Sequence, residues 1–142
     1  MNLGIKPYQL APALNLVIGQ RLVRKLHTCA TKREATLPEL QEIKEAVRSI
    51  NEVDPTRKPD FDGNIRTAVG CDEDSHDGYQ GRLAVAEALD VNNDIKDMIL
   101  NGKNTLEIYA ELRNHGFLTM KEDAYLKMLE GKTTLEEIRR VL

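Results

Sequence analysis

The sequence has neither a surplus of one charge nor a long apolar run, and each absence excludes a class of protein. Twenty Lys and Arg residues against 23 Asp and Glu give a net charge of −3, with both signs interspersed. The basic field that drives sequence-independent nucleic-acid binding is therefore missing. The longest stretch without charge, residues 7–20, contains two prolines and is shorter than the ~20 apolar residues of a membrane span. We expect neither a nucleic-acid partner nor a membrane span.

Cysteine is also scarce, which excludes a disulfide-stabilised secreted scaffold. Cys29 and Cys71 are the only two cysteines, and a single distant pair is not a disulfide framework. Residues 7–20 lack the basic start and small-residue cleavage site of a secretory signal. A reducing, cytoplasmic setting is therefore expected. The length of 142 residues with 41% apolar residues is enough for one modest domain with a core.

The sequence contains no motif for binding phosphate or for nucleophilic catalysis. Neither G-x-x-x-x-G-K-[ST] nor G-x-G-x-x-G occurs, so no glycine-rich loop leads into a helix N-terminus to hold a phosphate. Cysteine and histidine are present, but no local signature places a nucleophile beside a base. We therefore assign no catalytic residue to this chain.

Apolar residues at three- and four-residue steps predict a largely buried helix over residues 10–26. On such a helix Arg21 and Arg24 lie three positions apart and share a face, with Gln20 beside them. The three side chains are candidates to contact a phosphate, a partner carboxylate or a neighbouring subunit. The alternative is an internal ion pair that anchors the helix.

The middle of the chain alternates between one clear helix and turn-rich segments. Pro38 opens a helix that continues to Ile50. Residues 54–63 form a loop, and residues 70–81 combine glycines with acidic residues in a composition typical of turns. Residues 82–89 are predicted to form a short strand.

Helix-capping signals repeat in the last third of the chain. An Asn or Thr followed three residues later by Glu, with Gly closing the preceding helix, predicts short helices. Four such helices are expected, capped by Asn92 or Asn93, Asn104, Thr119 and Thr133. The predicted fold class is mainly α with a small β element (α+β), as a bundle of short helices beside a loop-rich region.

Three blocks of sequence in one order resemble the C-terminal region of the bacterial type IV pilus assembly and type II secretion ATPases. They are Q-R-L-V-R-K-L at residues 20–26, G-Y-Q-G-R-L-A-V-A-E-A-L at 78–89 and L-E-G-K-T-T-L-E-E-I-R-R-V at 129–141. The resemblance covers nearly the whole chain except residues 38–62. It implies a hexameric cytoplasmic motor whose P-loop, with its ATP and Mg²⁺, precedes this region.

The resemblance implies that residues 1–142 are a C-terminal fragment acting as a structural and inter-subunit domain. Residues 28–81 would be a knuckle-like insertion, and residues 82–142 a strand followed by helices. The implied partners are the ATPase core of the same chain, neighbouring protomers and an inner-membrane platform protein, which would hold the motor at the membrane periphery. ATP hydrolysis is implied for the parent protein, for pilus assembly or for secretion. The alternative is a free-standing, non-catalytic adaptor.

Many members of that family carry C-x-x-C twice in this region and bind zinc with four thiolates. Here the two segments read C-A-T-K and C-D-E-D, so only Cys29 and Cys71 remain. Two thiolates cannot close a tetrahedron, and a metal-free, degenerate knuckle is expected. A mixed-ligand site would add His27, Asp74 or His76.

The G-Y-Q-G-R block suggests roles for three further residues. Gly78 and Gly81 are expected to serve turn geometry with positive φ. Arg82, where the turn meets the strand, is a candidate to contact the motor core or an adjacent protomer, and the alternative is an ordinary surface arginine. The charged residues of 136–140 are expected to cap and solvate the last helix.

Overall fold

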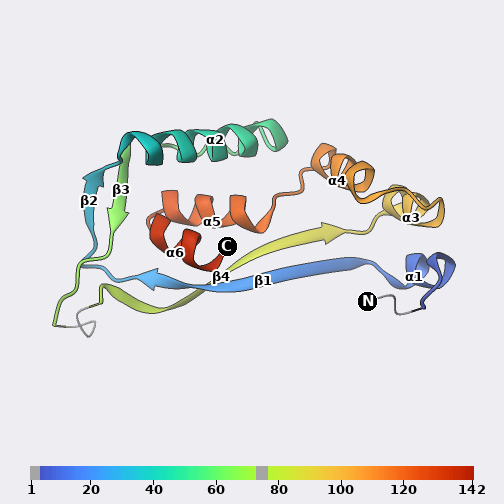
Figure 1. Ribbon diagram of the computed structural model, residues 1–142, viewed down its shortest axis with the longest axis horizontal. Helices are drawn as coiled ribbons and strands as arrows, with labels where there is room; N and C mark the ends of the chain where they lie inside the picture. Colours follow the sequence, from blue (N-terminus) through green and yellow to red (C-terminus); the bar gives the residue numbers. More distant parts are fainter. Residues whose placement is uncertain (1–3, 73–76) are drawn as a thin grey trace.

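One long antiparallel ribbon forms the base of the structure (Figure 1). The computed structural model describes residues 4–72 and 77–142. Strand β1 (Leu16–Leu26) pairs with β4 (Tyr79–Asp90), from Leu16 opposite Asp90 to Leu26 opposite Tyr79. A second antiparallel ribbon, β2 (Thr31–Glu34) with β3 (Asn64–Thr67), rises from one end of the first.

Six helices accompany these strands in the described residues. They are α1 (Pro7–Ala13), α2 (Leu37–Val53), α3 (Asn93–Leu100), α4 (Thr105–Asn114), α5 (Met120–Leu129) and α6 (Leu135–Val141). The predicted α+β class is confirmed. The predicted helix from Pro38 to Ile50 is confirmed as α2, and the predicted strand is confirmed as the longer β4.

The short C-terminal helices begin where the capping signals predict them, except the last. Asn92, Asn104 and Thr119 accept hydrogen bonds from the backbone of the first turns of α3, α4 and α5. The cap of α6 is Thr134, one residue after the predicted Thr133. The hydroxyl of Thr133 instead donates to the carbonyl oxygen of Arg24 on β1, 2.9 Å away.

The predicted helix over residues 10–26 is wrong, because residues 16–26 form strand β1. The only helix in this segment is α1, which ends at Ala13. Leucine and valine occur on both faces of the strand, so apolar and polar residues do not alternate as they do in a half-buried strand. The apolar residues happen to be spaced three and four positions apart, which is the pattern of a helix. Pairing with β4 decides the conformation here, as tertiary contacts often override local pattern.

The strand changes the relation between Arg21 and Arg24. Successive side chains of a strand point to opposite faces, so positions 21 and 24 face opposite ways. The shared helical face expected from the sequence therefore does not exist.

The main core lies on one face of the β1–β4 ribbon. Val23 and Val85 are fully buried there against α5 and α6, and α2 completes the layer with Ile43 and Ile50, seven positions apart on one helical face. In Figure 1, α2, α5 and α6 all lie on the same side of the ribbon, and no helix is drawn on its other side.

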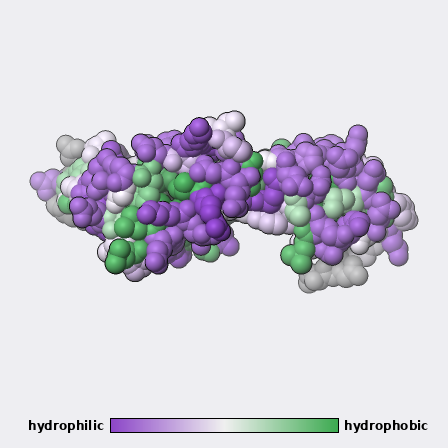
Figure 2. Space-filling model, turned by 90° about the horizontal axis from the view of Figure 1, so that it is seen from above, coloured by the Kyte–Doolittle hydropathy of each residue, from purple (hydrophilic) through white to green (hydrophobic). Residues whose placement is uncertain are grey.

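A smaller core lies at the end of the β1–β4 ribbon that is far from the β2–β3 ribbon (Figure 1). Val91, Ile95 and Leu112 are buried there among α1, α3 and α4. The predicted single bundle of short helices is therefore divided into two groups. Seen from above, the molecule narrows between these two lobes, and hydrophilic residues cover most of the visible surface (Figure 2).

Within the described parts of the chain, no helix combines the length and apolarity needed to cross a membrane.

Candidate functional site

The face of the β1–β4 ribbon that points away from the helices is uncovered and largely apolar. Residues directly opposite in an antiparallel pair share a face, and the register therefore gathers one set of side chains here. Ile18 and Leu22 are 59% and 52% exposed, and the residues opposite them are alanines. We call this set the outer face: Ile18, Gln20, Leu22 and Arg24 of β1 with Arg82, Ala84, Ala86 and Ala88 of β4.

The two edges of the β1–β4 ribbon differ in how far the helices cover them. Along β4, helix α5 covers the edge: the Asp123 carboxylate accepts a hydrogen bond from the Ala86 N–H, and the Lys127 ammonium donates to the Ala84 carbonyl, both at 2.8 Å. Along β1, only the end is closed: the Arg24 N–H donates to the Glu137 carboxylate at 3.0 Å, and the Leu26 N–H donates to the Lys132 carbonyl at 2.9 Å. In the described residues, β4 is the only strand beside β1.

An open strand edge beside exposed apolar side chains is a typical place for another segment to pair or pack. From Leu16 to Leu22, strand β1 presents such an edge together with the apolar part of the outer face. This combination makes the ribbon a candidate interface.

A buried carboxylate fastens α6 to the end of β1. Glu137 is 1% exposed, and its carboxylate accepts hydrogen bonds from the Arg24 backbone N–H at 3.0 Å and from the Arg24 side-chain Nε at 2.8 Å. Arg140 donates to the same carboxylate through Nε at 2.8 Å and Nη2 at 2.7 Å. The prediction that the charged residues of 136–140 cap and solvate the helix is therefore wrong for Glu137, because this side chain is buried away from solvent. A buried carboxylate must be paired, and the two arginines provide that pairing.

The environment of Glu137 keeps it ionised. Hydrogen bonds from Arg140 and then Arg24 lower the pKa of this carboxyl group to about 2, against the opposing effect of burial. The Arg24 guanidinium also lies over the Tyr79 ring, 3.9 Å from its centroid, in a cation–π contact. The internal ion pair that the sequence offered as an alternative is present for Arg24.

A hollow of about 670 Å³ opens where the outer face meets α6. Arg24, Arg82 and Arg140 line it, with Asp77 and Tyr79. Arg24 and Arg82 are directly opposite each other in the register, and like charges in that position repel. Glu137 accepts hydrogen bonds from Arg24 and Arg140, and the Asp77 carboxylate lies 3.6 Å from the Arg24 guanidinium. Arg82 adds a third positive charge to these two carboxylates, so the hollow favours an anionic group from outside.

The sequence-predicted interface residues separate into two groups. Gln20, Arg24 and Arg82 share the outer face, as the register requires. Arg21 lies on the other face, where its guanidinium donates to the Val141 carbonyl at the end of α6. Sequence reasoning missed Glu137 as the residue that joins α6 to β1. No local signal distinguishes it, because Glu136 stands three residues before Arg139 just as Glu137 stands three residues before Arg140.

Gly78 and Gly81, assigned to turn geometry from the sequence, both have φ of +77°. At Gly81 the register gains one residue on β4, because Arg24 faces Arg82 while Leu26 faces Tyr79, the arrangement of a β-bulge. At Gly78 a Cβ atom would stand 2.7 Å from the Val69 backbone nitrogen. Only glycine therefore allows the segment around Val69 to cross so close to the start of β4.

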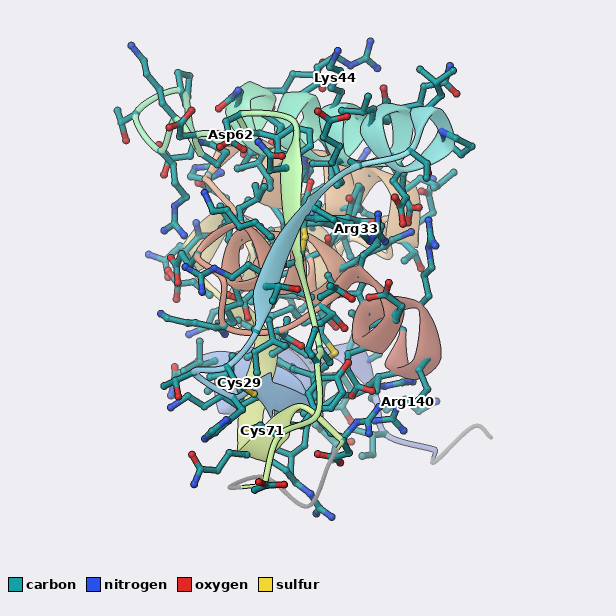
Figure 3. All side chains as sticks on the ribbon, turned by 90° about the vertical axis from the view of Figure 1, so that its left-hand side faces the viewer. Cys29, Arg33, Lys44, Asp62, Cys71 and Arg140 are labelled. Carbon is teal, nitrogen blue, oxygen red and sulfur yellow. The ribbon has the colours of Figure 1, made fainter. Side chains whose placement is uncertain are left out.

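That crossing creates a second cluster, at the base of the β2–β3 ribbon (Figure 3). The Nδ1 atom of His27 lies 3.1 Å from Cys29 Sγ and 3.5 Å from Cys71 Sγ, and the three donor atoms lie within 4.8 Å of one another. We call His27, Cys29 and Cys71 the thiol cluster. Asp74 and His76, the other residues proposed for a mixed-ligand site, lie outside the described residues.

The thiol cluster does not supply the four thiolates of the zinc site implied by the family. Among the described residues it offers two sulfurs and one imidazole nitrogen, and structural zinc requires four ligands. The position three residues after Cys29 is Lys32, whose ammonium lies 3.6 Å from the Asp62 carboxylate. A cation thus occupies the place of a thiolate.

The ion pair at Glu137 predicts a measurable contribution of Arg24 to stability. Arg24→Ala should lower the free energy of unfolding by about 1–3 kcal/mol, because it removes charge-assisted hydrogen bonds while Arg140 still holds the carboxylate. Arg82→Ala, its neighbour across the ribbon, should change it by no more than ~0.5 kcal/mol. Urea midpoints of the two variants test this, and equal effects would contradict it.

The low pKa of Glu137 predicts acid sensitivity. Its pKa of about 2 in the folded protein is below the ordinary value, so its stabilising contribution is present above about pH 4.5 and is lost as the pH falls toward 2. Glu137→Gln should cost about 3 kcal/mol near pH 7 and lose less stability than the parent protein across this window. Glu136→Gln, at an exposed neighbour, is the control. Parallel pH profiles for Glu137→Gln and the parent would refute the assignment.

The incomplete donor set predicts that the purified protein holds no stoichiometric zinc. A chelator should leave its melting temperature unchanged, because structural zinc otherwise contributes directly to folding. Elemental analysis provides the measurement. About one zinc per chain, lost together with stability in Cys71→Ser, would show that the cluster is a metal site.

Comparisons with known proteins agree with the resemblance seen in the sequence. The family model described as Type II/IV secretion system protein matches residues 1–140. Type IV pilus assembly ATPase PilB of Acinetobacter baylyi is 34% identical over 99% of this chain, which corresponds to 23% of that protein. The Thermus thermophilus protein of the same name is 32% identical over 96% of this chain and 14% of its own length.

Relatives from secretion systems also match nearly the whole chain. Type II secretion system protein E of Xanthomonas campestris is 32% identical over 99% of this chain and 23% of that protein. The chain thus spans less than a quarter of the length of these relatives. Its nearly complete match to the family model shows that the chain belongs to the type II/IV secretion system protein family.

Proposed function

We propose that this chain is the C-terminal structural and inter-subunit part of a hexameric ATPase that powers type IV pilus assembly or type II protein secretion. The observation that carries the proposal is the outer face of the ribbon. Its apolar part is open along β1, and Arg82 adds positive charge at one end of it. Helices on one face of an antiparallel sheet are typical of an α+β domain and leave the other face available to a partner.

The proposed contact for the apolar part of the outer face is the nucleotide-binding core of the motor. Leu22 and Ile18 lie directly opposite alanines on the neighbouring strand. The small alanine side chains leave space beside Leu22 and Ile18 for large side chains of a layer that packs on this face. The adjacent hollow, with Arg82, suits a carboxylate of the core or of the next protomer.

Nucleotide chemistry is assigned to the rest of the motor. The chain has no glycine-rich loop for the triphosphate, and backbone donors of such a loop, a fixed lysine and a Mg²⁺ site are needed together. ATP and Mg²⁺ are accordingly proposed for the core. The inner-membrane platform protein of the pilus or secretion machine is the proposed external partner, which places the assembly at the cytoplasmic side of the inner membrane.

The proposal predicts that the outer face controls association with the core. Leu22→Glu should weaken binding of this chain to the separately expressed ATPase core by at least about tenfold, since burial of an unpaired carboxylate costs more than ~1.4 kcal/mol. Leu106→Glu is the matched control, because Leu106 is 80% exposed on α4, away from the ribbon. Calorimetry gives the affinity, and phosphate release by the mixture reports on function.

Two outcomes would refute the proposal. One is equal weakening by both variants, which would point to an unspecific effect of charge. The other is the absence of any association between the parent chain and the core, with no effect on phosphate release. Circular dichroism of each variant separates these outcomes from unfolding, because an exposed position on the outer face should tolerate a charge in the isolated chain.

A further inference from the structure

We propose that Cys29 and Cys71 form a reversible disulfide when the protein meets a peroxide or a small-molecule disulfide. This oxidative modification site is independent of the proposed function, because it uses the thiol cluster and no residue of the outer face.

The two sulfurs come from distant parts of the sequence and meet at one point. Cys29 lies in the connection between β1 and β2, and Cys71 follows β3. Figure 3 shows both at the base of the β2–β3 ribbon. Their Sγ atoms lie within 4.8 Å of each other, and the proposed bond requires rotation of the side chains and shifts of the two loops that bring the sulfurs to about 2.05 Å.

The backbone around the sulfurs is held, so their proximity is built into the fold. The His27 N–H donates to the Gly78 carbonyl at 3.0 Å, and the Ala30 N–H donates to the His27 carbonyl at 3.1 Å. Cys29 Sγ lies 3.0 Å from the Val69 carbonyl oxygen, and Gly78 permits the close crossing of that segment. The same contacts that shape the turn therefore bring the thiols together.

The two cysteines are more exposed than the histidine beside them. Both cysteines are partly exposed, and His27 is only 7% exposed. Oxidation of a thiol requires access for the oxidant and a nearby partner sulfur to resolve the first product. The cluster provides both.

The reaction with hydrogen peroxide balances without any further component. The sulfur of one cysteine, whose proton passes to His27 Nδ1, attacks the O–O bond and becomes a sulfenic acid, while the leaving hydroxide takes up a proton as water. The second sulfur then attacks the sulfenic sulfur, forms the S–S bond and releases a second water. Two thiols lose two electrons in total, and peroxide gains them. With a small-molecule disulfide, two thiol–disulfide exchanges give the same product and two small thiols.

The bond would enclose the segment that carries β2, α2 and β3. In a reducing setting the thiols remain separate, and the disulfide appears only under oxidation. Closure of this loop restricts the unfolded chain, and for a 142-residue protein the expected rise in melting temperature is roughly 5–10 °C. A thiol reductant should reverse it.

The test uses the 142-residue chain. After treatment with hydrogen peroxide or oxidised glutathione, we expect an intact mass lower by two hydrogen atoms, loss of both free thiols and a monomer on non-reducing gels. Peptide mapping should recover one peptide pair that joins the segments of Cys29 and Cys71. The melting temperature should rise as stated and return after treatment with dithiothreitol.

Cys29→Ser and Cys71→Ser are matched variants that keep one thiol each. With oxidised glutathione, each should stop at a mixed disulfide with one glutathione, and neither should gain thermal stability. Persistent free thiols in the oxidised parent protein, crosslinked dimers in place of the internal bond, or a stoichiometric zinc that protects both sulfurs would each overturn the proposal. Because the mapping is done on the parent protein, misfolding of a variant leaves the test intact.

Discussion

The pairing of β1 with β4 is the constraint on which the other contacts depend. It joins residues 16–26 to residues 79–90 and so closes the chain between them into a loop. That loop contains α2 and the β2–β3 ribbon, and its closure brings the two cysteine-bearing segments to the same end of β1. The pairing also defines which side chains face the helices and which remain on the outer face. Without this register, neither candidate site would exist.

The helices are attached to the ribbon by polar contacts along its edges as well as by the apolar core. Asp123 and Lys127 of α5 satisfy the backbone of β4, and Glu137 of α6 satisfies the backbone of β1. Covered edges cannot pair with other chains. On the β1–β4 ribbon, these contacts therefore restrict any added strand or layer to the remaining part of β1 and to the outer face.

The sequence predicted local structure best where the signal was short and chemical. Caps such as Asn104 and Thr119 identified their helices, because a side-chain oxygen and a backbone N–H three residues away are local partners. Strand β1 was mistaken for a helix, because its identity depends on β4, more than 50 residues away in the chain. The same limit applied to Glu137: its neighbours at 136–140 suggested solvent, and only the approach of β1 shows that it is buried. The family was recognisable because three blocks kept their order, which does not require knowledge of the fold.

The separation into two lobes affects which part of the molecule can unfold locally while the rest stays folded. The smaller lobe is organised around Val91, Ile95 and Leu112, a much smaller buried set than that of the main lobe. Free energies of local opening follow the apolar surface buried in each cooperative unit. The α1–α3–α4 end can therefore open and close many times while α2, α5 and α6 stay folded on the ribbon. Amide protons of the two lobes should accordingly belong to different exchange classes, and the ribbon that connects them is the boundary between two units of folding.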